Sequence, residues 1–262
     1  MPSGMSFGKE LDLARRTARR AAELAMGYQA AGLRTDYKSD HSPVTSADRA
    51  CERLIAAALE EAFPEDGLLG EEGASKESRN GRRWIIDPID GTRDFIRGLP
   101  LWCVMIALEE DGEVKAGVVH LPMLGHTCWA SRGDGAFRNG VRIRASSVAS
   151  IAEAVLCPNG LNRASGTPYG KALLEWAASA WSVRCLGGTP DAMMVAAGEA
   201  DVWIEPQVAP WDLAAPQVIL EEAGAAFFDF QGERTIHSGS AVGCAPGLAS
   251  DVKTFFYEIG PR

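Results

Sequence analysis

Apolar residues in the first part of the chain recur at helical spacing. They predict a helix over residues 8–31 that packs one apolar face against a core. The residues of this face are Leu11, Ala14, Ala18, Ala21 and Leu24. After a turn-rich stretch at 35–43, the same spacing predicts a second helix from about Ser46 to residue 63, which Pro64 ends. Two amphipathic helices are therefore expected to open the fold.

The middle of the chain changes to strand-like patterns. A short apolar run at 84–87 predicts a buried strand, and further strands are expected at 102–108, 114–120 and 126–131. Asp111-Gly112 and Asn139-Gly140 are typical hairpin turns, because both residues of each pair tolerate positive φ angles. This region predicts an antiparallel sheet.

The last hundred residues alternate between the two patterns. Strand-like runs are predicted at 183–186, 202–205, 226–230 and 241–244, and helical patterns at 171–180, 191–197, 212–223 and 248–259. Such alternation favours an α/β layer. Because 159–168 is rich in Gly, Asn and Ser, we expect a domain boundary between 150 and 168. We assign 1–155 to an N-terminal α+β domain and 156–262 to a C-terminal α/β domain.

Charge and hydropathy narrow the classes of partner. The formal charge is −9 and the pI about 5.0, so the average field repels nucleic acids and anionic membranes. No apolar run approaches the roughly 18 residues that a membrane span requires. Residues 1–8 lack the apolar core of a secretory signal, so we expect a cytoplasmic protein. A bound phosphate would need a local positive charge, and a metal ion is the simplest source.

The six cysteines are scattered and include no CxxC pair: Cys51, Cys103, Cys128, Cys157, Cys185 and Cys244. We interpret them as reduced thiols in the core of a cytoplasmic protein, and a zinc site is not expected from their spacing.

The strongest chemical signal is the hexapeptide Asp87-Pro88-Ile89-Asp90-Gly91-Thr92, which follows the predicted buried strand. Ligands gather at the carboxyl ends of strands in α/β proteins. Two carboxylates this close repel each other, and a divalent cation would remove the conflict. Oxygen ligands without histidine or thiolate favour Mg²⁺ over Zn²⁺. The alternative interpretation is a turn that caps a helix, with purely structural carboxylates.

Other acidic positions are ambiguous when taken singly. Glu71-Glu72 after Gly70 is also typical of a solvated surface. Asp212 after Trp211, and Asp48 near the start of the second predicted helix, are equally compatible with helix capping.

Taken together, these segments resemble the inositol monophosphatase family. The resemblance rests on Gly70-Glu71-Glu72, on Trp84 through Thr92, on Trp211-Asp212-Leu213-Ala214-Ala215 and on Glu221-Glu222-Ala223-Gly224, and it covers nearly the whole chain. It implies a magnesium-dependent, lithium-sensitive phosphatase that hydrolyses a small phosphorylated substrate through activated water. It also implies a layered αβαβα sandwich and a homodimer. Trp102, Trp176 and Trp181 are candidates for the partner surface if they are exposed, but a place in the core is the favoured interpretation for each.

The resemblance implies a role for each matching position. In a site for two or three Mg²⁺ ions, the ligands would be Glu71, Asp87, the carbonyl of Ile89, Asp90 and Asp212. The phosphate would be bound by the N–H groups of Gly91 and Thr92. The catalytic residues that position the attacking water would be Glu71, Thr92 and Asp48. The rest of the substrate would contact Gly187, Gly188, Thr189 and Glu205.

Residues near these motifs bear on the substrate. The segments 63–67 and 95–100 and the Gly187-Gly188 pair resemble the histidinol-phosphate phosphatase branch, which makes histidinol phosphate the leading candidate. Thr189 replaces the acid usual after the paired glycines, and Asp94 stands where a small neutral residue is common. An inositol phosphate, fructose bisphosphate or a nucleotide 3′-phosphate therefore remain alternatives, as does a regulatory protein that kept the fold without turnover.

Overall fold

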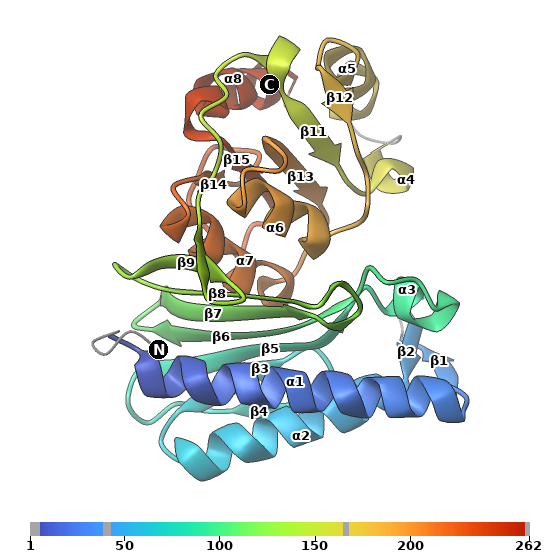
Figure 1. Cartoon of the computed structure of the whole chain (residues 1–262), viewed down its shortest axis with the longest axis vertical. Helices are drawn as coiled ribbons and strands as arrows, with labels where there is room; N and C mark the ends of the chain where they lie inside the picture. The colour runs from blue at the N-terminus through green and yellow to red at the C-terminus, as the bar shows by residue number, and fades with distance from the viewer. Residues whose placement is uncertain (1–5, 39–42, 165–167, 260–262) are drawn as a thin grey trace.

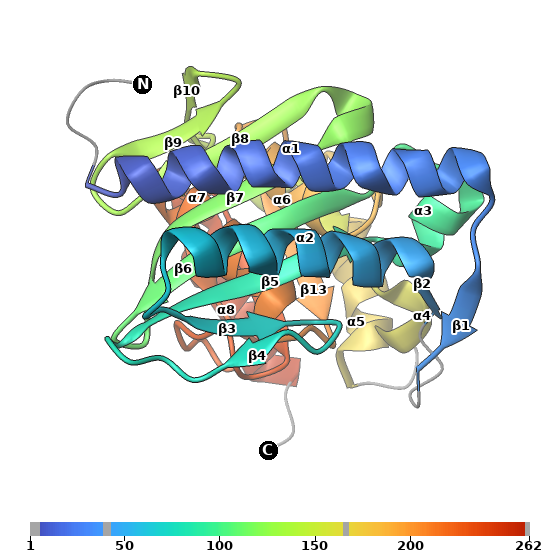
Figure 2. The same cartoon turned by 90° about the horizontal axis from the view of Figure 1, so that it is seen from below.

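The computed structural model describes residues 6–38, 43–164 and 168–259. Helices and sheets alternate in five layers (Figure 1). Helices α1 (Gly8–Ala31) and α2 (Ser46–Ala62) cover one face of an eight-stranded sheet (Figure 2). Helices α6 (Thr189–Ala196) and α7 (Pro210–Glu222) lie between this sheet and a five-stranded sheet, whose far face α5 (Pro168–Ala177) and α8 (Ala249–Ile259) cover. The expected αβαβα sandwich is confirmed.

The eight-stranded sheet has the order β10-β9-β8-β7-β6-β5-β3-β4. Its strands are β3 (Gly67–Gly70), β4 (Ser75–Lys76), β5 (Arg82–Asp90), β6 (Cys103–Glu110), β7 (Glu113–Leu121), β8 (His126–Ser131), β9 (Gly135–Arg138) and β10 (Val141–Ile143). All neighbouring pairs are antiparallel except β3 and β5, which are parallel. Both predicted hairpin turns form, and Asp111 and Asn139 take φ angles of 52° and 51° in them.

Helices α1 and α2 form where their periodicity predicts. The buried stripe of α1 is rich in alanine, and Ala14, Ala18 and Ala21 are almost completely buried. These small side chains let the helix backbone lie close to β6 and β7. At the start of α2, the Thr45 Oγ1 accepts a hydrogen bond from Ala47 N at 3.1 Å, and the Asp48 carboxylate accepts one from Thr45 N at 2.8 Å. This reciprocal cap determines where Asp48 lies.

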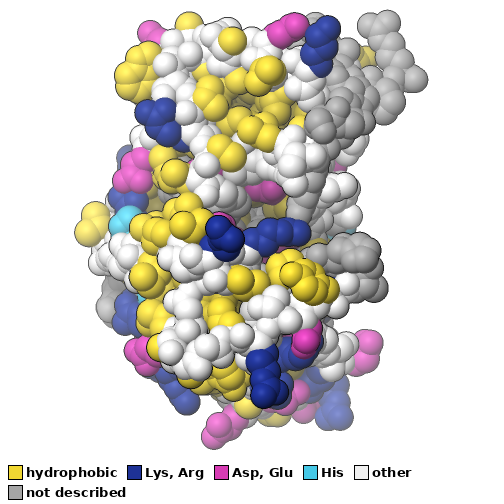
Figure 3. Space-filling view, turned by 90° about the vertical axis from the view of Figure 1, so that its right-hand side faces the viewer, with side chains coloured by type: hydrophobic (Ala, Val, Ile, Leu, Met, Phe, Trp, Pro, Cys, Tyr) yellow, Lys and Arg dark blue, Asp and Glu magenta, His cyan; other side chains and the backbone are white. Residues whose placement is uncertain are grey.

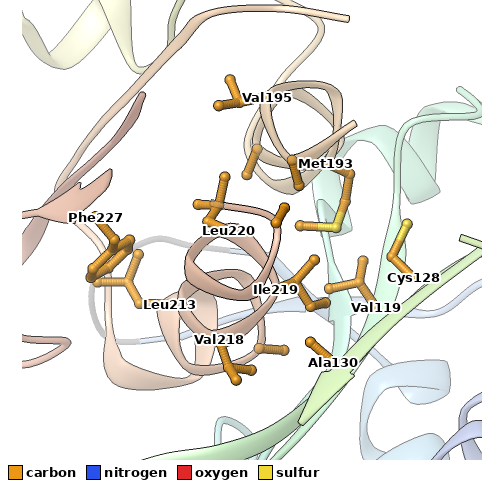
Figure 4. Packing of buried hydrophobic residues seen from close by; sticks show 14 of the residues in the cluster. Val119, Cys128, Ala130, Met193, Val195, Leu213, Val218, Ile219, Leu220 and Phe227 are labelled. Atoms are coloured by element: carbon orange, nitrogen blue, oxygen red, sulfur yellow. The ribbon is translucent and has the colours of Figure 1, made fainter. Parts of the chain in front are cut away.

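The middle layer depends on a close approach between α7 and β7. Every residue of α7 from 213 to 220 is buried. A Cβ atom at Gly117 of β7 would lie 2.7 Å from Val218 Cγ1 and 2.9 Å from Ala215 Cα, so only glycine permits this packing distance. Figure 4 shows the same layer near Ile219, which points toward Val119 of the sheet. The contact determines how deeply α7, and the site residue at its first turn, sits on the sheet.

The five-stranded sheet has the order β12-β11-β13-β15-β14. Its strands are β11 (Val155–Pro158), β12 (Ser182–Val183), β13 (Val202–Pro206), β14 (Ala226–Phe228) and β15 (Ser240–Cys244). β11 is parallel to β12 and β13, whereas β15 is antiparallel to β13 and β14. The remaining elements are short: β1 (Thr35–Tyr37), β2 (Pro43–Thr45), α3 (Thr92–Arg97), α4 (Leu161–Ala164) and three 3₁₀ turns, η1 (Pro122–Leu124), η2 (Ile151–Glu153) and η3 (Pro246–Leu248).

Several boundaries differ from the sequence expectations. The predicted strand at 183–186 is only the two-residue β12, because the backbone then leaves the sheet and becomes the glycine loop described below. β11 was not predicted, and it lies inside the region assigned to a domain boundary. The division at 155/156 stays a prediction, and one buried cluster contains residues from both sides of it, such as Val119 and Leu220.

The cysteines and tryptophans are largely in the core. All six cysteines are free thiols, and five are buried as expected, but Cys185 is exposed and the core interpretation is wrong for it. Trp102 is fully buried and Trp176 stacks on Phe255, so of the three candidate surface tryptophans only Trp181, at 73% exposure, is open to solvent. No helix in the described part of the chain has the length and hydrophobicity of a membrane span.

Candidate active site

Asp87 and Asp90 lie on one side of the sheet because β5 contains a bulge. Residues three apart on a regular strand point to opposite faces. Here Asp87 is opposite Met105 and Asp90 is opposite Cys103, so the same stretch is three residues long in β5 and two in β6. β5 therefore contains one extra residue. Pro88, which has no N–H group to donate to the ladder, lies in this interval. The bulge within the hexapeptide therefore points both carboxylates to the same side of the sheet.

Glu71 reaches the same place from the neighbouring parallel strand. Gly70 at the end of β3 pairs with Ile86, and Glu71 N donates a hydrogen bond to Ile86 O at 3.1 Å. The buried Glu52 carboxylate accepts hydrogen bonds at 2.7 Å from the N–H groups of Glu72 and Ala74, which holds the turn in place. A Cβ atom at Gly70 would overlap that carboxylate and force Glu52 away from these two N–H groups.

Asp212 completes the cluster from α7. Its Oδ2 accepts a hydrogen bond from Ala209 N at 2.7 Å, so one oxygen caps the helix while the carboxylate remains beside the two aspartates of β5. Carboxylate oxygens of Asp87, Asp90 and Asp212 all lie within 4.8 Å of one another. The three predicted ligands thus come together from two distant segments.

The electrostatics of this cluster fit a hard divalent cation. Burial, followed by the charges of Glu71, Asp90 and Asp212, raises the pKa of Asp87 well above its usual range. Burial and the charge of Asp90 raise the pKa of Asp212 to about 7. Asp87 Oδ1 accepts a hydrogen bond from Ile89 N at 3.0 Å, but its buried Oδ2 has no hydrogen-bond partner among the described residues. Convergent oxygens with an unsatisfied buried acceptor suit Mg²⁺.

Lys38 is a site residue that the sequence reasoning missed. Its Nζ lies 2.8 Å from Glu71 Oε1 and 2.7 Å from Glu72 Oε1. Burial alone would lower the pKa of Lys38, but the hydrogen bonds to the two glutamates outweigh it and the pKa is raised. No local signal identified this lysine, because its partners are separated from it by the whole of α2. We therefore add it to the site as a resident positive charge.

Thr92 links the cavity to Asp48. The Thr92 hydroxyl lies 3.3 Å from Asp48 Oδ1 and 3.2 Å from Ile89 O, and it can donate its single proton to either. Asp48 is fully buried, and its other oxygen accepts two hydrogen bonds from Thr45, so it reaches the cavity only through Thr92. Burial raises the pKa of Asp48.

Asp90 is held by partners from both halves of the chain. Burial raises the pKa of Asp90, whereas hydrogen bonds from Thr189, from the Cys103 thiol and from the Gly91 N–H favour its charged form. Thr189 is 2% exposed, and its Oγ1 also lies 3.4 Å from Met105 Sδ. Its side chain therefore supports a candidate metal ligand, and its predicted contact with substrate remains a prediction, as does that of the Gly91 N–H with phosphate.

The candidate residues line one cavity of about 890 Å³. Its charged lining comprises six acids (Glu71, Asp87, Asp90, Asp94, Glu205 and Asp212) and two bases (Lys38 and Arg93). Gly187, Gly188 and Thr189 form part of its wall. Figure 3 shows Lys and Arg side chains across the middle of the face that α3 and β12 border, with acidic side chains visible beside them. Of the predicted site residues, only Asp48 lies outside this lining.

A model of the inositol monophosphatase family matches residues 9–255. The chain belongs to the inositol monophosphatase family. As a member, the protein is a phosphoric monoester hydrolase. The family resemblance of the sequence motifs is thereby confirmed.

Individual relatives of this inositol monophosphatase family member match over most of their length. The histidinol-phosphatase of Chlorobaculum parvum is 41% identical over 234 residues, which are 89% of this chain and 90% of that protein. The histidinol-phosphatase of Mycobacterium tuberculosis is 41% identical over 251 residues, 94% and 96% of the two chains. The solved structure of Thermotoga maritima IMPase superimposes with a TM-score of 0.86 at 33% identity, covering 96% of this chain and 98% of that one.

Proposed function

We propose that this phosphatase hydrolyses histidinol phosphate and uses Mg²⁺ as its cofactor. The observation that carries the catalytic part is the convergence of Asp87, Asp90 and Asp212 around a buried carboxylate oxygen with no protein partner among the described residues. Support for the substrate comes from the names of the two relatives at 41% identity, which match almost end to end.

In this proposal the acidic cluster would bind two or three Mg²⁺ ions. Glu71, Asp87 and the carbonyl of Ile89 would hold one ion, and Asp87, Asp90 and Asp212 would hold another. When bound, such ions neutralise charge on the phosphate and lower the pKa of the attacking water. The contribution of the chain is to hold the ligands in place through the β5 bulge, the cap on α7 and the turn that Glu52 supports.

The attacking water is positioned by Thr92 and Glu71. If the Thr92 hydroxyl donates to Asp48 Oδ1, its lone pairs remain to accept a hydrogen bond from the water. Asp48 then acts as a positioning residue behind Thr92, and Glu71 accepts a hydrogen bond from the other O–H group of the water. The N–H groups of Gly91 and Thr92 bind the phosphate oxygens. Binding requires the Gly91 N–H to exchange its hydrogen bond with Asp90 for one with the phosphate.

An inositol phosphate is the second candidate substrate, supported by the names of Thermotoga maritima IMPase and of the inositol-1-monophosphatase of Rhizobium meliloti, which is 35% identical over 222 residues. Steady-state assays with Mg²⁺ on histidinol phosphate, inositol 1-phosphate, fructose 1,6-bisphosphate and a nucleotide 3′-phosphate separate the candidates. We expect the highest kcat/KM for histidinol phosphate. Comparable slow turnover of all four would refute a specific substrate.

Asp90→Asn tests whether the cluster is catalytic. We expect loss of Mg²⁺-dependent turnover, while the metal-free variant melts at or above the temperature of the wild type because repulsion among the buried carboxylates is relieved. Asp251→Asn, at an exposed position of α8, is the matched control and should keep full activity. An active Asp90→Asn enzyme would show that the site is misplaced, and a wild-type protein without any turnover would favour the regulatory alternative.

The proposal extends to assembly and location. We propose a homodimer through the exposed apolar surface around edge strand β12, which comprises Leu174, Trp181, Val183 and Leu186. A cytoplasmic location is supported by the six free thiols, which include the exposed Cys185.

A further inference from the structure

Gln207 has a backbone conformation that its residue type disfavours. Its φ angle is 58°, and the other non-glycine residues with a positive φ in the described part of the chain are Asp111 and Asn139. Those two lie in hairpin turns, where short Asp and Asn side chains tolerate the left-handed conformation because they can hydrogen-bond to nearby backbone. The longer side chain of glutamine does not favour this conformation, so its adoption at position 207 destabilises the fold.

The segments on either side of Gln207 hold it in this conformation. Pro206, the last residue of β13, lies so close to Gly160 that a Cβ atom on that glycine would be 2.7 Å from the proline Cγ. On the other side, Val208 N donates a hydrogen bond to Gly239 O at 3.1 Å, and the chain then enters α7. Because both neighbours are fixed, any residue at position 207 must make the same turn.

The side chain of Gln207 continues a row of cavity residues that begins on β13. Side chains two residues apart on a strand share a face, and Trp203, Glu205 and Gln207 all line the cavity. Trp203 is 1% exposed and Glu205 is 8% exposed, whereas Gln207 is open to solvent. Gln207 therefore lies at the mouth of the cavity, and it provides the only side-chain amide among the described residues of the lining.

An amide at the mouth offers directional hydrogen bonds without adding charge. It has two N–H donors and an oxygen that accepts, in a lining that already contains six acids and two bases. When the phosphate of an ester is bound at the acidic cluster, its alcohol part occupies the rest of the cavity. Hydroxyl groups or ring nitrogens on that part can form hydrogen bonds with an amide, and a few such polar contacts determine which ligand a cavity accepts.

We propose that Gln207 is a specificity-determining residue whose side-chain amide hydrogen-bonds a neutral hydroxyl or ring nitrogen on the alcohol part of the substrate. The inference rests on the proposed phosphatase function, and it applies to whichever of the four candidate esters the enzyme prefers. Glycine at position 207 would remove the strain, and strained backbone is concentrated at sites that bind ligands or catalyse reactions. A side chain at this position serves the substrate in a way that glycine cannot.

The test separates the amide of Gln207 from the strain of its backbone. Gln207→Ala removes the amide and keeps the strained φ angle, whereas Gln207→Gly removes both. We expect each variant to raise KM for the preferred ester about fivefold, as for the loss of one hydrogen bond, with little change in kcat. Gln207→Asn keeps an amide that is one methylene shorter, and it should recover part of this loss.

Two further measurements show whether the effect is local to the alcohol part. KM for ethyl phosphate, whose alcohol part has no hydroxyl or ring nitrogen, should be the same in wild type and in all three variants. The affinity for Mg²⁺, measured by calorimetry, should also be unchanged. Gln207→Gly should melt roughly 2–4 °C above Gln207→Ala, because only glycine relieves the strain.

Asp111→Gly is the matched control. It replaces another non-glycine residue of positive φ, at a hairpin turn outside the cavity lining, so it should leave KM for both esters unchanged.

Each contrary result has a distinct meaning. If Gln207→Ala and Gln207→Gly keep the wild-type KM for the preferred ester, the role of Gln207 is overturned while the proposed function stands. If KM rises equally for ethyl phosphate, or the affinity for Mg²⁺ falls, position 207 acts by placing α7 and the specificity role is overturned. If the two variants melt at the same temperature, the backbone carries no strain and the reason for assigning Gln207 a role is overturned. If wild type hydrolyses no phosphate monoester, the proposed function itself fails.

Discussion

Replacing Gly117 by alanine tests how the fold positions the active site. The new Cβ atom would lie 2.7 Å from Val218 Cγ1 and 2.9 Å from Ala215 Cα. Val218 can rotate, but the Ala215 Cα is backbone and moves only with α7. Since carbon atoms in contact are about 3.5–4.0 Å apart, α7 must shift from β7 by roughly 0.6–1.1 Å.

The size of the effect follows from this displacement. Overpacking of a close-packed interior costs about 1–3 kcal/mol of unfolding free energy. In a chain of this size that lowers the melting temperature by roughly 2–12 °C. The shift also moves Asp212, at the first turn of α7, away from Asp87 and Asp90. Because Mg²⁺ tolerates little departure from its octahedral geometry, we expect its affinity to fall about tenfold.

Thermal melts with and without Mg²⁺, and titration of Mg²⁺ by calorimetry, measure both effects. Gly27→Ala is the matched control, since a Cβ atom there meets nothing within 4 Å and the position lies in α1. That variant should be more stable than wild type by up to about 1 kcal/mol, because alanine favours helix, and its Mg²⁺ affinity should be unchanged. If Gly117→Ala is as stable as wild type and binds Mg²⁺ equally well, the close approach does not position α7.

Three further predictions address other parts of the molecule. Lys38→Met should destabilise the metal-free protein by roughly 1–2 kcal/mol, because Glu71 and Glu72 lose charged hydrogen bonds. Mg²⁺ should then raise the melting temperature of this variant more than that of wild type. Equal melting temperatures of the two metal-free proteins would contradict this prediction. Burial lowers the pKa of His120, so the unfolded chain binds a proton there at a higher pH than the folded protein does. The free energy of unfolding should therefore fall as pH drops below about 6.5, and it should fall less in His120→Gln. Urea titrations at several pH values measure this difference. Trp181→Glu should convert the proposed dimer to an active monomer in light scattering, and an unchanged mass would exclude this surface.

Local signals in the chain predicted much of this protein. The alanine-rich stripe of α1, the hairpin turns at 111–112 and 139–140 and the strand before Asp87 each act over a few residues, and each forms as expected. Strands β3 and β11 were missed because their residues form strands only when paired with β5 and β13. The length of β12 was overestimated because the residues after Val183 serve the glycine loop.

The active site, too, can be predicted from the sequence only in part. The chemical identity of the ligands can be read from the sequence, because the hexapeptide contains both its aspartates and the proline that accompanies the bulge. The meeting of the hexapeptide with Asp212 and Lys38 cannot be read from it, since neither residue has a local feature that distinguishes a ligand from a helix cap or a surface charge. Those partners meet only because α7 packs at contact distance on Gly117 and because β1 and β2 bring Lys38 back beside Glu71. A short motif can specify which atoms bind a metal, but bringing distant carboxylates within 4.8 Å of one another requires the packing of the whole middle layer.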